Sequence, residues 1–321
     1  MKILVTGGAG FIGAALANQL AADGHQVRVV DDLSNGNRDR LAPSIMFTQG
    51  EVNNVPRLWT LLQDVDCVYH LAARVSVAES RLYPQEYNTV NVGGTVALMA
   101  AMRDAGVGRV VLASSGAVYG KQMEQPVHEN DVPIPDSPYA VSKFSAEQYV
   151  RTIGERWEIE TVSLRIFNAY GAGQSLPVSH APVVPRFLHQ ALTGGSIVIH
   201  GNGLQTRDFV YISDVVSALV AASTARLVGH QVINIGSGQE TNINTLVDTI
   251  EKVVGSSVNR LYNNSRRGGV QKLVADISRA EQILGYRPIV SLAEGLQRIL
   301  VEDERFRRLH SNKAIKKAHL N

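Results

Sequence analysis

Short runs of consecutive apolar residues alternate with longer stretches of helical periodicity over the first two-thirds of the chain. The runs are rich in Val, Ile and Leu, which is typical of strands buried on both faces of a sheet. The predicted strands cover residues 3–5, 27–30, 45–48, 67–71, 109–113 and 161–166. The predicted helices between them cover residues 11–22, 55–63, 91–105 and 139–157. This alternation predicts an α/β fold with a doubly wound parallel sheet.

The pattern changes after Asn168, where Pro and Gly become frequent. Here we predict loops, a helix over 184–192, a strand over 232–235 that returns to the sheet, and helices over 243–254 and 292–301. We expect one domain made of residues 1–167 and about 206–241, and a smaller, discontinuous lobe made of about 168–205 and 242–304. A ligand should bind between them, at the carboxyl ends of the strands. Residues 305–321 are expected to form a basic, solvated helix end and a frayed tail.

Composition narrows the possible classes of protein. The chain is 45% hydrophobic and 19% charged with a net charge of +2, so nothing indicates a nucleic-acid or anionic-membrane partner. The single cysteine, Cys67, excludes an internal disulfide and is expected to be a small buried hydrophobe. No His/Cys cluster has metal-ligand spacing, so no metal site is expected. No apolar run approaches about 18 residues, and no signal peptide is evident, so we expect a cytoplasmic protein.

The first βα turn carries a candidate dinucleotide site. The segment TGGAGFIG at residues 6–13 directly follows the first predicted strand and opens the first predicted helix. Gly7, Gly10 and Gly13 would permit a tight turn, close approach of a pyrophosphate and close helix packing. Asp31 ends the second strand, where a carboxylate accepts hydrogen bonds from ribose hydroxyls and repels a 2′-phosphate. The pattern therefore favours NAD over NADP.

Tyr139 and Lys143 form a candidate base. Four residues on a helix are one turn, so the two side chains share a face. Lowering a phenol pKa from about 10 to about 7 requires roughly 4 kcal/mol. A Lys charge about 5 Å away, at an effective dielectric near 20, supplies on the order of 3 kcal/mol. We therefore expect Lys143 nearly to suffice, with a second positive charge, such as an oxidised nicotinamide, completing the activation.

Nine motifs occur in order along about residues 1–304. They are TGGAGFIG at 6–13, DDLSNG at 31–36, HLAA at 70–73, NVGGT at 91–95, SSGAVYG at 114–120, YAVSK at 139–143, RIFNAYG at 165–171, QTRDFVYISD at 205–214 and NIGSG at 234–238. With them the chain resembles the extended short-chain dehydrogenases/reductases, within the NAD-dependent epimerase/dehydratase family. It is most similar to the nucleotide-sugar 4-epimerases of that family.

The resemblance implies a set of NAD contacts. The adenosine and pyrophosphate end would be surrounded by Gly7, Gly10, Phe11, Ile12, Gly13, Asp31, Leu33, Ser34, Asn35 and Gly36, with Glu51 and Val52 near the adenine. Glu51 stands where the family more often has Asp. The nicotinamide side would be lined by Leu71, Ala72 and Ala73, and the contacts would be completed by Asn91, Ser114, Tyr139 and Lys143.

The resemblance also implies the substrate side and the reaction. Ser115 matches the catalytic Ser/Thr, while Asn168, Arg207 and Arg266 match residues that hold the diphosphate of a UDP-sugar. Tyr139 would take the proton of the sugar 4-hydroxyl. Hydride would pass from C4 to the nicotinamide, and a transient 4-keto sugar would turn before hydride returns to its opposite face. The helices over 91–105 and 139–157 resemble those that pair in a homodimer.

Other activities on the same fold stay open. The 4,6-dehydratases follow the catalytic Ser/Thr with an Asp-Glu pair, and uronate decarboxylases tend to carry a Glu in this segment. Gly116 and Ala117 stand at those places. A non-catalytic NAD-binding scaffold would be expected to lack Ser115, Tyr139 or Lys143. Leu273 and Gly269 leave the sugar and the base open, since the family often has Asp at the second of these positions.

Overall fold

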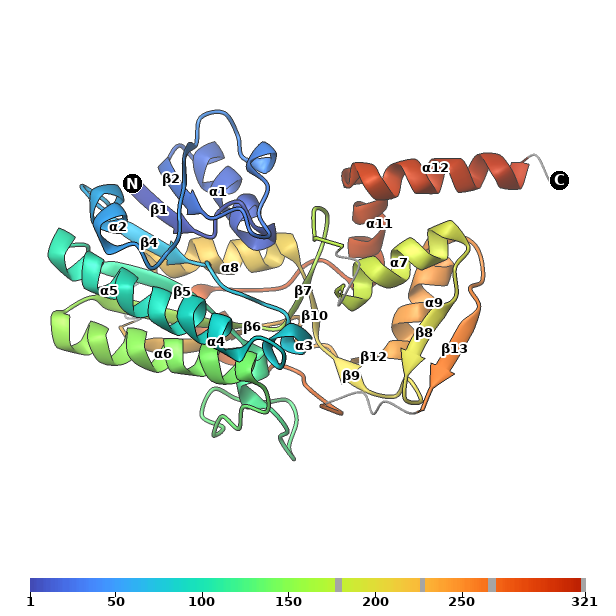
Figure 1. Cartoon of the computed structure of the whole chain (residues 1–321). Coiled ribbons are helices and arrows are strands. Elements are labelled where there is room, and N and C mark those ends of the chain that lie inside the picture. The colour runs from blue at the N-terminus through green and yellow to red at the C-terminus, as the bar shows by residue number, and fades with distance from the viewer. Residues whose placement is uncertain (177–180, 226–228, 265–269, 319–321) are drawn as a thin grey trace.

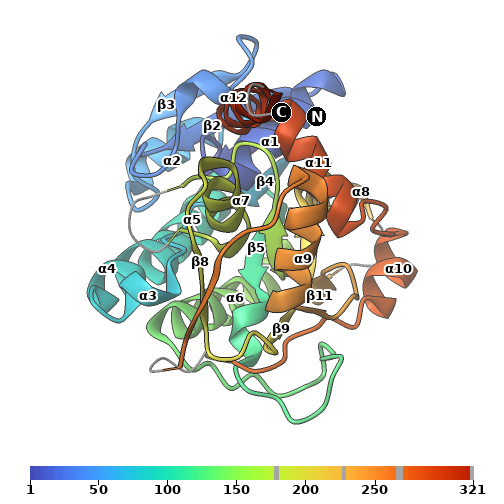
Figure 2. The same cartoon turned by 90° about the vertical axis from the view of Figure 1, so that its right-hand side faces the viewer.

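The computed structural model describes residues 1–176, 181–225, 229–264 and 270–318, with the side chains of residues 314–318 left out. Figure 1 shows a larger body that contains the central sheet and the N-terminus, and a smaller lobe beside it. Figure 2 views the molecule from the side of the smaller lobe, with its helices in front of the sheet. Among the described residues, none of the helices combines the length and apolar character that crossing a bilayer requires.

The central sheet has seven strands, all paired in parallel, in the order β11-β6-β5-β4-β1-β2-β3. They are β1 (Lys2–Thr6), β2 (Gln26–Asp31), β3 (Met46–Gln49), β4 (Cys67–His70), β5 (Arg109–Ser115), β6 (Glu160–Ile166) and β11 (Gln231–Ile235). The strand order reverses between β1 and β4, and a ligand binds at such a switch point in doubly wound sheets. The predicted fold class and its seven strands are confirmed.

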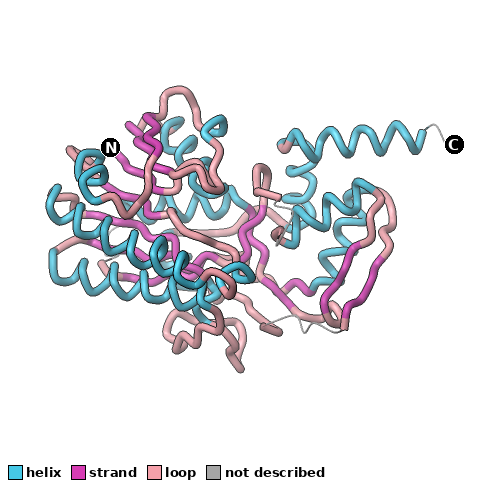
Figure 3. The backbone as a smooth tube through the Cα atoms, in the orientation of Figure 1, coloured by secondary structure: helices cyan, strands magenta, loops and turns pink. Residues whose placement is uncertain are grey.

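Helices cover both faces of this sheet (Figure 3). One face is covered by α1 (Phe11–Ala22) and α8 (Ile212–Thr224), and the other by α2 (Val55–Leu61), α5 (Gly94–Ala105) and α6 (Pro138–Trp157). Successive residues of a strand point to opposite faces. Ile3 and Val5 accordingly belong to one buried cluster, and Leu4 belongs to another with residues of α5. This two-sided burial explains why the strands are continuous apolar runs.

Two helical segments differ from the prediction. The helix expected over 91–105 begins as a π-helix, η2 (Asn88–Gly93), before α5. Helix α8 was not predicted, although Ile212, Val215, Val216 and Leu219 carry the apolar i, i+3, i+4, i+7 spacing of a helix buried on one face.

The smaller lobe combines helices with short strand pairs. Its helices are α7 (Val183–Thr193), α9 (Ile243–Val254), α11 (Leu292–Glu302) and α12 (Glu304–Ala318). Its strands pair as β8 (Ile197–His200) with β13 (Arg260–Asn263) and β9 (Thr206–Arg207) with β12 (Thr241–Asn242). Between lobe and sheet, β7 (Asn168–Tyr170) pairs with β10 (Phe209–Tyr211) (Figure 1). The remaining elements are η1 (Arg38–Arg40), α3 (Val77–Ser80), α4 (Pro84–Tyr87), η3 (Gly116–Tyr119) and α10 (Ser278–Leu284).

Asp208 joins the smaller lobe to the sheet. Its side chain is fully buried between β9 and β10. One carboxylate oxygen accepts from the Ser237 N–H at 2.6 Å and the Ser237 hydroxyl at 2.7 Å. The other accepts from the N–H groups of Gly238 at 3.0 Å and Ala275 at 3.2 Å. These bonds connect the segment before β10 to the loop after β11 and to the chain before α10.

The C-terminal segment contains the expected helix end, but this helix is long and packs against the lobe. Helix α12 continues to Ala318, and Phe306 is only 1% exposed within the main core cluster. The Lys313 ammonium also donates to the Ala191 carbonyl of α7 at 2.6 Å. A count of basic residues gave no weight to Phe306, which is buried in the main core cluster, or to Leu309, which packs against it.

Replacing Phe306 with Ala tests this packing. We expect the free energy of unfolding in urea to fall by about 3 kcal/mol or more, as for buried Phe→Ala changes in general. The control is Ile289→Ala, because the Ile289 side chain is 78% exposed and should contribute little. Equal losses in the two variants would contradict a role of Phe306 in this packing.

Candidate active site

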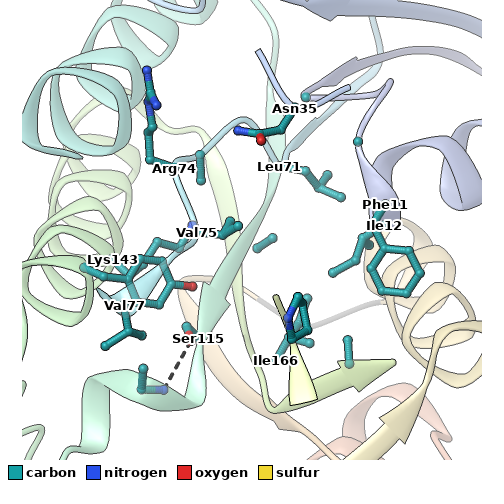
Figure 4. Close-up of a pocket in the computed structure, with 18 of the residues that line it drawn as sticks. Phe11, Ile12, Asn35, Leu71, Arg74, Val75, Val77, Ser115, Lys143 and Ile166 are labelled. Atoms are coloured by element: carbon teal, nitrogen blue, oxygen red, sulfur yellow. Dashed lines mark hydrogen bonds between the residues drawn. The ribbon is translucent and has the colours of Figure 1, made fainter. Parts of the chain in front are cut away.

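A cavity of about 720 Å³ lies at the carboxyl ends of the central strands. Figure 4 shows Phe11, Asn35, Ser115 and Lys143 around the same space. Most of the predicted site residues line this cavity: Gly7, Gly10, Phe11, Ile12, Gly13, Asp31, Ser34, Asn35, Gly36, Val52, Leu71, Ala72, Ala73, Ser114, Ser115, Tyr139, Lys143, Asn168 and Arg207. Residues up to 200 positions apart in the sequence therefore share one cavity.

Three of the predicted site residues do not line this cavity. Glu51 faces a neighbouring groove beside Asp32. Leu33 turns the chain with φ +62° and donates its N–H to Asp31. Asn91 is buried behind the wall, where its amide bonds to both backbone groups of Arg74, at 2.8 and 3.0 Å, and to the Ser142 hydroxyl at 2.9 Å. Arg266 and Gly269 lie outside the described residues.

The Gly-rich turn is packed too closely for side chains. A Cβ on Gly13 would lie 2.2 Å from the Gly7 carbonyl oxygen, and a Cβ on Gly7 would lie 2.6 Å from the Ala72 nitrogen. Gly7 also has φ +67°, which favours glycine. No side chain caps the N-terminus of α1. The helix therefore presents its first N–H groups to the cavity, which fits the pyrophosphate of NAD.

Asp31 lines the cavity beside the Gly-rich turn. Its carboxylate accepts from the N–H groups of Ala9 at 3.0 Å and Leu33 at 2.8 Å. Burial raises its pKa, while these two hydrogen bonds oppose the rise. A carboxylate beside the turn suits ribose hydroxyls and opposes a 2′-phosphate, as the sequence indicated.

The candidate catalytic groups lie on two neighbouring elements. Ser115 ends β5, and its hydroxyl accepts from the Ala117 N–H at 3.2 Å. Tyr139 and Lys143 lie in the first turns of α6, whose start is fixed by Pro138 and by the Ser137 hydroxyl, which accepts from the Ala140 N–H. The Tyr139 ring packs edge-to-face against Tyr87, with 6.4 Å between centroids. Both α6 side chains are buried yet border the cavity.

In the protein without NAD, burial of both side chains opposes the expected activation of Tyr139 by Lys143. Burial of the phenol raises the pKa of Tyr139, and a hydrogen bond with Ser115 only partly opposes this. Burial also lowers the pKa of Lys143 to about 8, because an ammonium loses hydration there. The spacing of Tyr139 and Lys143 in the sequence indicates the attraction between ammonium and phenolate. The loss of hydration that opposes both charges depends on the folded structure. A further positive charge is needed to favour the phenolate.

Gly116 and Ala117 occupy the start of η3 beside the cavity. A Cβ on Gly116 would lie 3.1 Å from ring carbons of Phe167, closer than ordinary contact. Phe167 is itself buried and packs on Tyr119, with 6.3 Å between ring centroids. A side chain at position 116 would therefore require the Phe167 ring to move by a few tenths of an ångström.

The guanidinium of Arg207 is held at the cavity wall by backbone acceptors. Its Nη1 donates to the carbonyls of Thr206 at 2.6 Å and Val270 at 2.8 Å. The carboxylate of Asp136, which also lines the cavity, supports its charge. Asn168 lies nearby at the start of β7. These two side chains can contact an anionic group such as a diphosphate.

His70 was missed as a positioning residue, although it belongs to the HLAA motif. The Thr95 hydroxyl donates to the Asn91 carbonyl at 2.6 Å, so it accepts from His70 Nε2, 2.9 Å away. His70 Nδ1 then accepts from the Thr6 hydroxyl at 2.7 Å, which in turn accepts from the Ala72 N–H. Burial lowers the pKa of His70 to about 3, so the ring is neutral. The sequence could have indicated this role, because His70 lies at the end of a strand that is predicted to be buried on both faces.

No cluster of His, Cys, Asp or Glu suited to a metal ion occurs in the part of the chain that the structure describes. The thiol of Cys67 is buried, as predicted, and burial raises its pKa to about 12. The site chemistry of the described residues is thus that of a dinucleotide-binding α/β protein with a Ser, Tyr and Lys set.

Comparison with known proteins specifies this class further. The chain belongs to the NAD dependent epimerase/dehydratase family, whose family model matches residues 3–236. A UDP-glucose 4-epimerase of Mycolicibacterium smegmatis is 38% identical over 304 residues, covering 92% of this chain and 96% of the relative. A UDP-glucose 4-epimerase from Thermotoga maritima, solved with UDP-glucose, has a TM-score of 0.90 at 34% identity and covers 96% of this chain and 99% of its own. A UDP-glucuronic acid 4-epimerase from Bacillus cereus, solved with UDP-glucuronic acid and NAD, has a TM-score of 0.85 at 34% identity, with 92% and 97% covered.

Replacing Gly13 with Ala should weaken retention of NAD. The added methyl group overlaps the Gly7 carbonyl, so the turn must move away from the pyrophosphate position. Because such overpacking costs roughly 1–3 kcal/mol, we expect about tenfold or greater loss of NAD affinity. The measurement is the NAD content of the purified protein, with calorimetric titration of stripped protein.

The matched control is Gly108→Ala. A Cβ at Gly108 meets nothing within 4 Å, so this variant should keep its NAD. Full NAD retention by Gly13→Ala would argue against the turn as the pyrophosphate site.

Proposed function

We propose that this chain is an NAD-dependent 4-epimerase that inverts C4 of a UDP-hexose. One cavity brings together a Gly-rich turn, the Ser115, Tyr139 and Lys143 side chains, and Arg207. The relatives, which are 4-epimerases of UDP-glucose and UDP-glucuronate, support the same reaction. NAD, when bound, accepts the C4 hydride and returns it to the opposite face of the sugar.

The residues of the chain take separate roles in this proposal. Tyr139 removes the proton of the 4-hydroxyl and gives it back after the sugar has turned. The Ser115 hydroxyl bridges the phenol and the sugar oxygen, and Lys143 stabilises the phenolate. Arg207 and Asn168, together with Arg266 of the undescribed segment, hold the diphosphate while the sugar moves. Binding energy from this remote group thereby positions the reacting carbon.

The observation that carries the proposal is the absence of an acid beside Ser115. Related dehydratases carry an Asp-Glu pair in this segment and uronate decarboxylases tend to carry a Glu there, whereas Gly116 and Ala117 have no polar side chain. The ring of Phe167 also occupies the space beside Gly116. A non-catalytic scaffold is disfavoured because Ser115, Tyr139 and Lys143 all border the cavity.

The sugar is to be identified by product analysis. Leu273 lines the cavity and is neither a large nor a small side chain, so N-acetylhexosamines and uronates join glucose and galactose as candidates. Purified protein would be incubated without added cofactor with a panel of UDP-sugars, and the products followed by NMR. Absence of a C4 epimer from every UDP-sugar would overturn the proposal.

Tyr139→Phe should remove activity while leaving the fold and the bound NAD intact. Loss of a positioned base lowers rates by roughly 10²- to 10⁴-fold, so we expect kcat to fall in that range. The readout is the initial rate of epimer formation, with NAD content measured on the same sample.

The matched control is Tyr149→Phe, a phenol on the same helix with its side chain exposed. It should retain the wild-type rate. Equal rates for the two variants would remove Tyr139 from the reaction.

We further propose the domain division and a homodimer. Residues 1–167 and about 206–241 would bind NAD, and about 168–205 and 242–304 would bind the UDP-sugar, since the cavity draws residues from both. Helices α5 and α6 lie side by side on the outside of the larger body (Figure 1). Large apolar side chains are exposed on α6 and on the adjoining segment between α3 and α4, namely Val141, Tyr149, Leu82 and Tyr83. Such a patch favours a symmetric contact between two copies.

Val141→Glu should separate the dimer. A carboxylate at the centre of an apolar contact loses hydration, so the mass in sedimentation should shift from twice 34.8 kDa toward 34.8 kDa. Val301→Glu, on the exposed face of α11, is the control and should leave the mass unchanged. A monomeric wild-type protein at micromolar concentration would refute the dimer.

A further inference from the structure

A buried ion pair lies directly behind the catalytic lysine. Glu147 follows Lys143 by one turn of α6 and is 1% exposed. Its Oε1 accepts from Arg165 Nη2 at 2.6 Å, and its Oε2 accepts from Arg165 Nε at 3.1 Å. Oε2 also accepts from the Ser114 hydroxyl at 2.9 Å. The carboxylate therefore connects α6 to β5 and β6.

The partners of Glu147 are themselves fixed. The Arg165 guanidinium is buried on β6 and lies over the Tyr119 ring, 4.7 Å from its centroid. Ser114 belongs to β5 and immediately precedes Ser115. Three hydrogen bonds from two strands hold the carboxylate in one orientation, so it has little freedom to turn toward or away from Lys143.

The spacing places two cations around this one anion. Residues four apart on a helix lie on the same face, so Lys143 and Glu147 both face β5 and β6. Arg165 and Lys143 are both buried, and two buried cations without an anion would be costly. The Glu147 carboxylate is bonded to Arg165 and lies one helical turn from Lys143, so its negative charge can act on both cations.

We propose that Glu147 is a positioning residue for the epimerase reaction, which keeps the Lys143 ammonium charged and in place beside Tyr139. This inference rests on the proposed function in so far as Lys143 acts on the Tyr139 phenolate. Glu147 does not line the cavity, so it acts through Lys143 and not on the sugar.

The other titratable groups around Lys143 do not replace Glu147. His70 on β4 interacts electrostatically with Lys143. Tyr87 on α4, Tyr119 on η3 and Arg165 on β6 belong to elements packed against α6, which also carries Tyr139. His70 is neutral, burial raises the pKa values of the three phenols, and Arg165 is a cation. Within the described ranges, Glu147 is the carboxylate whose charge acts on Lys143.

The sign of the effect follows from two opposed causes. Burial lowers the pKa of Lys143 to about 8, and the Glu147 carboxylate raises it. Lys143 is therefore charged below that pH and loses its charge as pH rises through it. Removing the carboxylate leaves burial unopposed, so the charge would be lost at a lower pH.

The test is a titration of Lys143 in the NAD-loaded enzyme. Protein grown with [ε-¹³C]lysine is followed by NMR from pH 6 to 10, and the Lys143 signal is assigned by its absence from Lys143→Met. In Glu147→Gln we expect the midpoint to fall by about one pH unit or more. In Glu155→Gln, the control, it should not move, because Glu155 pairs with Arg151 at 3.4 Å on the exposed side of the same helix.

The activity profile supplies a second readout. On the alkaline limb, kcat of Glu147→Gln should be about tenfold lower than that of the wild type at the same pH, with a smaller change in KM. Glu147→Asp keeps a carboxylate, so its kcat at alkaline pH should be closer to that of the wild type than the kcat of Glu147→Gln is. A purely structural role would lower kcat equally at all pH values. If Glu147→Gln does not fold, Glu147→Gln/Arg165→Met removes both buried charges and serves in its place.

The outcomes separate the two proposals. An unchanged Lys143 midpoint in the folded variant overturns the role of Glu147, whatever the activity. A lowered midpoint in a protein that epimerises no UDP-sugar supports the Glu147–Lys143 coupling and overturns the proposed function. A lowered midpoint together with a shifted alkaline limb supports both.

Discussion

The free-energy cost of burying charged side chains is the constraint on which the walls of the cavity depend. Asp208 and Glu147 are both buried, and each is stabilised only because several donors converge on it. The donors of Asp208 come from the loop after β11 and the segment before α10, and those of Glu147 come from β5 and β6. These two acids therefore specify how the cavity walls are assembled, since moving one of these elements would take donors away from a buried carboxylate.

Local pattern was sufficient for most of the fold. The limits of α1 and α9 follow from apolar periodicity and flanking glycine or asparagine, and agree with the prediction. The π-helical start at Asn88 could not be predicted, because it depends on how Asn91 reaches the Arg74 backbone and α6. The packing of the C-terminal helix against the lobe could not be predicted for a similar reason. It depends on burial of Phe306, which stands among basic residues in the sequence.

The features of the candidate site also fall into those that local sequence predicts and those that depend on the folded structure. Gly7, Gly13 and Asp31 were predictable because steric and electrostatic demands act within one βα turn and the next strand end. Roles that depend on burial were not predictable. The phenol of Tyr139 is harder to ionise than its spacing of one helical turn from Lys143 suggests. The cause is burial of both side chains, which depends on how the whole core packs. The same holds for Asp208, which stands beside Arg207 in the sequence yet bonds elsewhere.

The contact between Gly116 and Phe167 bears on how activities diverge within the family. An acid at position 116 would first meet a buried ring, so its benefit depends on a prior change at position 167. A smaller residue at 167 alone would leave a void against Tyr119 and lower stability. The effect of a substitution at one of these two positions therefore depends on the residue at the other, which is epistasis in the evolutionary sense.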